Sequence, residues 1–74
     1  MMLKNYSRVR MLTDAYQGEN VHAGMVGYVI EIYPNDHYEI EFSNADGITV
    51  AQIVAKGNEI ELYPEEVERL VVEG

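Results

Sequence analysis

Polar and apolar residues alternate along several stretches of the chain, as expected for strands that bury one face. The alternation is clearest at residues 38–42 (YEIEF), where the aromatic and aliphatic side chains fall on one side and the two glutamates on the other. Residues 25–33 (MVGYVIEIY) are rich in β-branched and aromatic residues, which favour a long strand. The pattern predicts strands at residues 7–12, 25–33, 38–42, 48–55 and 60–63.

Turn-forming residues separate these stretches. Residues 34–37 (PNDH) end the second strand, and the Asp-Gly pair at 46–47 accepts positive φ and so predicts a hairpin. Residues 13–24 show neither a strand nor a helix period, which predicts an exposed connection. Residues 65–72 follow a proline and fit a short helical turn; alternatively, residues 69–72 extend an edge strand.

Three glycines are expected to have structural roles: Gly24, Gly27 and Gly47. Gly24 and Gly47 suit backbone conformations that other residues avoid. Residues 25–33 look apolar on both faces, which a bulge near Gly27 or burial on both sides would explain. A meander of five short strands with one strongly bent strand predicts an all-β small barrel that occupies residues 1–74 as a single domain.

The charge of the chain restricts its partners. Thirteen acidic residues against five basic ones give a net charge of −8, which repels phosphate backbones and anionic membrane surfaces. The absence of cysteine excludes disulfides, thiolate nucleophiles and cysteine-ligated metals. No apolar run approaches the roughly 20 residues of a membrane span, and residues 1–10 lack the apolar stretch of a signal peptide. A cytoplasmic protein is therefore expected.

Residues 24–33 (GMVGYVIEIY) carry the pattern G-x-x-G-x-V followed by an alternating strand, and this opening resembles that of SH3-like and KOW-type barrels. With residues 38–42 and 46–49, the stretch from residue 8 to 62 resembles a family of small bacterial SH3-like proteins classed as a domain of unknown function. The resemblance implies a five-stranded SH3-like barrel, sometimes encoded beside a toxin-like partner gene, without a catalytic motif. Residues 13–23 contain no lysine or arginine, unlike nucleic-acid-binding KOW domains.

Candidate catalytic chemistry is sparse. The serines and threonines stand in no recognisable nucleophile context, and a barrel filled by its own side chains offers little room for a pocket. Asp36, His37 and Glu39 form the one local cluster that could hold a metal ion, but turns select such residues for conformational reasons. We therefore predict no enzymatic activity, no cofactor and no metal site.

A binding surface is the more informative hypothesis. Glu39 and Glu41 should point outward, with Glu31 beside them across the hairpin, and four tyrosines lie on or near this hairpin. The predicted partner-binding residues are Tyr16, Tyr28, Glu31, Tyr33, Tyr38, Glu39 and Glu41. The predicted function is that of an acidic antitoxin, immunity or accessory protein that covers a basic surface on a protein partner.

Three alternatives stay open at this level. The acids could serve only to keep a small protein soluble. The domain could bind nucleic acid in the KOW manner if Arg8, Arg10 and Lys56 converged on one face. It could also assemble with itself as a homodimer, because a thin core and exposed strand edges favour association.

Overall fold

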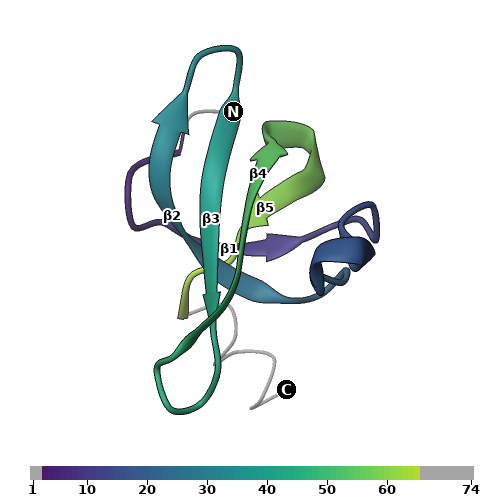
Figure 1. The fold of residues 1–74 in the computed structure, drawn as a ribbon. Coiled ribbons are helices and arrows are strands. Elements are labelled where there is room, and N and C mark those ends of the chain that lie inside the picture. The colour runs from purple at the N-terminus through teal and green to yellow at the C-terminus, as the bar shows by residue number, and fades with distance from the viewer. Residues whose placement is uncertain (1–2, 66–74) are drawn as a thin grey trace, which may run out of the picture.

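The computed structural model describes residues 3–65, which form one sheet of antiparallel strands (Figure 1). Its elements are β1 (Arg8–Met11), the 3-10 turn η1 (Gln17–Glu19), β2 (Val26–Tyr33), β3 (His37–Ser43), β4 (Thr49–Lys56), the 3-10 turn η2 (Gly57–Glu59) and β5 (Ile60–Leu62). The prediction of an all-β domain with five strands is confirmed, each strand within two residues of its expected bounds. All but the first residue of the helical turn predicted at 65–72, and all of the alternative strand at 69–72, lie outside the described residues.

The strands follow the order β4-β3-β2-β1-β5. The strand β2 belongs to both halves of the sheet, because Val26–Tyr28 pairs with β1 and the part from Tyr28 onward pairs with β3. Figure 1 shows the resulting bend, with β2 sweeping from below β1 up into the long β2–β3 hairpin. The register between β2 and β3 shifts at Ile30, the irregularity of a β-bulge, three residues beyond Gly27.

Gly27 lies where the bent strand crosses closely over β3. A Cβ atom at this position would lie 2.7 Å from the carbonyl oxygen of Glu41 and 2.8 Å from Cδ1 of Phe42. The structural role expected for this glycine is therefore to allow the close approach of two strands. The positive φ expected for the other two structural glycines is confirmed, with 90° at Gly24 and 78° at Gly47.

The core lies on the concave inner side of the sheet and contains apolar side chains of all five strands. Its buried members are Leu3, Val9, Met11, Val21, Val29, Tyr38, Ile40, Phe42, Ile53, Ala55 and Ile60. The inward set predicted for residues 38–42 is confirmed, since Tyr38, Ile40 and Phe42 are each at most 3% exposed.

The connection at 13–24 is not simply exposed, which corrects the prediction. Val21 is completely buried, and the half-buried Tyr16 packs against the core. Two isolated apolar residues in a segment without a period leave no pattern, so only the tertiary structure shows that they are anchors.

The sheet ends in two different edges. β5 is three residues long, whereas β4 is eight residues long and pairs with β3 on one side only. Within residues 3–65 no ladder joins β4 to β5, so the curved sheet is not closed by backbone hydrogen bonds.

Candidate protein-binding surface

The predicted acidic residues lie on the outer face of β2 and β3. Pairing places Glu31 directly opposite Glu39, and Tyr28 opposite Glu41. Tyr33, at the end of β2, pairs with His37 and points the same way. We call this surface the acidic face, and it consists of Tyr28, Glu31, Tyr33, Glu39 and Glu41.

Glu39 is the centre of a hydrogen-bond network on this face. The hydroxyl of Tyr33 donates to its Oε1 at 2.5 Å, and the side-chain amide of Gln52 donates to its Oε2. The bond from Tyr33, followed by that from Gln52, lowers the pKa of Glu39, and the same bond raises the pKa of Tyr33. The Glu39 carboxylate is therefore held ionised and in a fixed orientation at neutral pH.

Gln52 was not predicted as a site residue. The alternation of the fourth strand places it on the outer face, but nothing in the sequence states which residue of β3 it meets. The register Glu41↔Gln52 supplies that information, because it brings the amide within reach of the neighbouring Glu39.

The other two acids of the face lack counter-ions. Within the part of the chain that the structure describes, no lysine or arginine forms an ion pair with Glu31 or Glu41. Like charges placed directly opposite on neighbouring strands destabilise a sheet by roughly 0.2–1 kcal/mol. The repulsion between Glu31 and Glu39 therefore opposes folding.

The tyrosines of this face are accessible to a partner. Tyr28 is 46% exposed and Tyr33 is 40% exposed, so each presents part of its ring to solvent. On the neighbouring strand, Val54 lies opposite Glu39 and is also exposed. The face thus combines carboxylates with aromatic and aliphatic area, as protein interfaces commonly do.

Tyr38 does not lie on the acidic face, although the sequence grouped it with the binding residues. Its ring is in the core and only 3% of the residue is exposed. Its hydroxyl donates to Oδ1 of Asp36 at 2.5 Å, and this bond, together with burial, raises the pKa of Tyr38. Its role is to hold the β2–β3 turn onto the body of the domain.

Tyr16 is also separate from this face, since its ring packs against the core on the inner side of the sheet. Its hydroxyl donates to Oε1 of Glu59 at 2.7 Å. Burial and the bond to the carboxylate raise the pKa of Tyr16 to about 12. Partial burial acts to raise the pKa of Glu59, but the Lys56 N–H, at 2.8 Å, and the Tyr16 hydroxyl outweigh it and lower that pKa.

A small basic cluster borders the acidic face on the side of β1. Arg10 forms an ion pair with Glu61, and the guanidinium carbons of Arg8 and Arg10 lie 5.6 and 4.6 Å from the centre of the Tyr63 ring. Lys56 is on β4, with β2 and β3 between it and this cluster. The three cations considered for nucleic-acid binding therefore do not converge.

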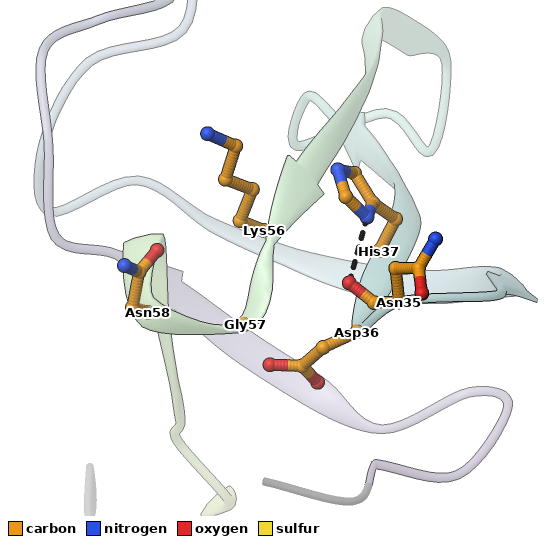
Figure 2. Close-up of a pocket in the computed structure, with 6 residues that line it drawn as sticks. All are labelled: Asn35, Asp36, His37, Lys56, Gly57 and Asn58. Carbon is orange, nitrogen blue, oxygen red and sulfur yellow. Dashed lines mark hydrogen bonds between the residues drawn. The ribbon is translucent and has the colours of Figure 1, made fainter.

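A shallow, open pocket of about 230 Å³ lies where the β2–β3 turn meets η2. Figure 2 shows the Asp36 carboxylate turned toward Gly57, with Lys56 directed away from it. The N–H of Gly57 donates to the carbonyl of Asp36 at 2.9 Å, and Nδ1 of His37 lies 2.9 Å from the carbonyl oxygen of Asn35. These bonds join the turn to the domain.

The residues considered for metal binding point to different places. Asp36 is engaged with Tyr38, whereas Glu39 belongs to the acidic face. Among residues 3–65 no group of three or more histidine, aspartate or glutamate side chains is placed to hold a metal ion. None of the helical segments in this part of the chain is long and apolar enough to cross a membrane.

The fold and this surface define a small antiparallel β domain with a charged, tyrosine-bearing outer face. A family model described as a domain of unknown function (DUF4926) matches residues 6–62, from just before β1 to the end of β5. The chain belongs to this family, which confirms the expected membership in a domain family of unknown function. No curated protein and no solved structure matches the chain.

Proposed function

We propose that this domain is a non-enzymatic, cytoplasmic protein-binding module whose acidic face covers a basic surface on a protein partner. The role that fits best is that of an antitoxin, immunity or accessory protein. The observation that carries the proposal is the pair of opposed carboxylates, Glu31 and Glu39, beside Glu41 and without counter-ions in the described residues.

The arrangement supports binding more than solubility alone. A solubilising coat needs no fixed geometry, and acids spread over the surface would avoid direct opposition. Here Tyr33 and Gln52 hold Glu39 in one orientation, and a preorganised carboxylate loses less entropy when it meets a lysine or arginine. Tyr28 and Tyr33 add aromatic area at the same place.

Charge also supports the choice of a basic partner. A net charge of −8 accelerates encounter with a cationic surface and disfavours acidic competitors. The partner is expected to place lysines or arginines opposite the three carboxylates. The interaction should therefore weaken as salt screens the charges.

The first experiment is co-purification. The tagged protein is expressed with its neighbouring genes, and proteins that elute in a fixed ratio are identified by mass spectrometry at about 0.05 and 0.5 M NaCl. We expect a basic partner that is retained at low salt and lost at high salt.

Variants then test the surface itself. Glu39→Gln and Glu41→Gln should each weaken the affinity for the purified partner by about tenfold. Glu19→Gln is the matched control, because Glu19 is an exposed acid in η1, away from the acidic face, and its replacement changes the net charge equally. Equal effects of all three variants, or no stoichiometric partner at either salt concentration, would contradict the proposal.

A further inference from the structure

The exposed edge of β4 is the second feature of the molecule that points to a partner. Residues 51–55 (AQIVA) contain no charge and no proline, two of the features with which sheet proteins usually protect an edge strand. Within residues 3–65, the edge of β4 that faces away from β3 has no paired strand. The register with β3 is continuous from Ala51 to Lys56, so this part of the strand is regular. At its end Oε1 of Glu59 accepts the Lys56 N–H at 2.8 Å, which leaves residues 51–55 as the unpaired edge.

From this edge we infer that two copies of the chain pair through β4 in antiparallel fashion, with the two-fold axis at Val54. This inference does not rest on the proposed function. Because residues that face each other across an antiparallel pair share one face of the sheet, Val54 meets Val54 of the second copy. Lys56 then meets Gln52 of the second copy on the same face.

The hydrophobic part of the contact is self-complementary. Val54 is 45% exposed in the single chain, although it lies in a regular part of the strand. Pairing at this register covers Val54 with Val54 of the second copy. On the inner side Ile53 faces Ala55 of the second copy, so the apolar cores of the two sheets become continuous.

Charge selects this register over the neighbouring ones. Lys56 forms no ion pair within the described residues, and Glu41 forms none either. Within each chain, Glu41 and Gln52 are cross-strand neighbours. The register places Lys56 beside Gln52 of the second copy, and therefore within side-chain reach of the Glu41 of that copy. An axis at Ile53 would instead place Lys56 opposite Val50, where the β3–β4 register is irregular.

The net charge of −8 does not prevent this contact. Within β4 the charged side chain is Lys56, so no acids face each other at the seam. Glu59, whose Oε1 accepts the Lys56 N–H at 2.8 Å, lies at the end of β4 that faces the uncharged Gln52 of the second copy. The acids of β3 are three strand spacings from those of the second copy, about 14 Å. That distance exceeds the Debye length of about 8 Å at physiological salt, so the repulsion is largely screened.

Sedimentation over a range of concentrations tests the inference. A seam of one strand pair is small, so we expect a monomer–dimer equilibrium with a dissociation constant on the order of 10–100 μM. A monomer at about 1 mM, or a ring of three or more copies, would overturn it.

Two matched variants test the position of the seam. Val54→Lys should raise the dissociation constant by at least tenfold, about 1.4 kcal/mol, since the new charges face each other. In the single chain the new lysine lies opposite Glu39, so the fold should be retained, as thermal unfolding will verify. Ile32→Lys adds the same charge at an exposed position on β2 and should leave the dimer unchanged. Equal effects of the two variants would refute the β4 seam.

Engineered cysteines test the register, since the natural chain has none. Val54→Cys should form an intermolecular disulfide under mild oxidation, because opposed residues have Cα atoms about 4.5–5.5 Å apart. Gln52→Cys should not, since the two positions 52 are displaced by four residues, about 14 Å. Cross-linking at 52 that equals or exceeds cross-linking at 54 would exclude the proposed axis.

Discussion

The tyrosines of this chain have different roles, which depend on the residue to which each hydroxyl group donates a hydrogen bond. Tyr33 donates to Glu39 on the surface, whereas Tyr16 donates to the partly buried Glu59. Both bonds raise the pKa of the tyrosine, but only the Tyr16 ring also packs against the core. Tyr16 should therefore contribute to stability, and Tyr33 to the orientation of the Glu39 carboxylate on the acidic face.

Replacement of Tyr16 by phenylalanine should reveal this contribution through its pH dependence. The pKa of Tyr16 is about 12 in the folded state, above the ordinary value of 10.0. The folded state therefore retains the proton more strongly, and the stabilisation is complete below pH 10 and lost as the pH rises toward 12. At pH 8 we expect Tyr16→Phe to lower the free energy of unfolding by about 1 kcal/mol, the modest value expected for a half-exposed hydrogen bond.

Urea unfolding at pH 8, 10 and 11 checks this expectation. The difference between the natural protein and Tyr16→Phe should shrink over this range, which starts below the ordinary tyrosine pKa of 10.0. Tyr28→Phe is the control, because Tyr28 is 46% exposed on the acidic face. A Tyr16→Phe difference that stays constant up to pH 11 would disagree with the assigned role.

At the scale of elements, the hairpins are held by turns whose geometry a few residues define. Between β3 and β4, Oδ1 of Asn44 accepts the N–H groups of Asp46 and Ile48 at 2.9 and 3.1 Å. The N–H of Gly47, at positive φ, donates to the carbonyl of Asn44 at 3.0 Å. Asn44 thus accepts the backbone N–H groups of Asp46, Gly47 and Ile48.

Asn44→Ala should therefore destabilise the β3–β4 hairpin. We expect the free energy of unfolding to fall by about 1 kcal/mol, because two backbone donors lose their acceptor. Amide exchange at Asp46 and Ile48 should accelerate. Asn44→Asp keeps an acceptor oxygen and should retain most of the stability, and Asn58→Ala, at an exposed position in η2, should have little effect. Unchanged exchange in Asn44→Ala would show that the turn does not depend on this side chain.

At the scale of the whole molecule, the charge that lowers the stability of the fold is the charge on which the proposed binding depends. The net charge is −8, and the register adds a local conflict by placing Glu31 opposite Glu39. Removal of one of these charges should help the fold and harm the proposed interaction. A surface that served only solubility would show the first effect without the second.

Glu31→Gln tests this trade-off in one protein. The free energy of unfolding should rise by about 0.5 kcal/mol at low salt, and the gain should shrink at about 0.5 M NaCl, where the repulsion is screened. Affinity for the basic partner should fall at the same time. Glu19→Gln serves again as the control for net charge. A variant that is no more stable than the natural protein at low salt would contradict the assigned repulsion.

Much of the fold could be predicted from the sequence, because its signals are local. The alternation at residues 38–42 and the Asp-Gly pair at 46–47 describe a strand and a turn without reference to distant residues. The outward direction of Glu39 and Glu41 follows from the same alternation. The acidity of the chain, on which the proposal of a basic partner depends, is a property of composition alone.

Other features depend on which distant residues meet, and only the tertiary structure decides that. The register brings Gln52 within hydrogen-bond distance of Glu39 and places Glu31 directly opposite Glu39. The strand order leaves the regular part of β4 at an unpaired edge of the sheet. Packing takes Tyr38 and Tyr16 away from the acidic face, although the sequence places them near the same hairpin. A period of two specifies the face of each side chain, but the free energy of pairing and core packing selects its neighbours.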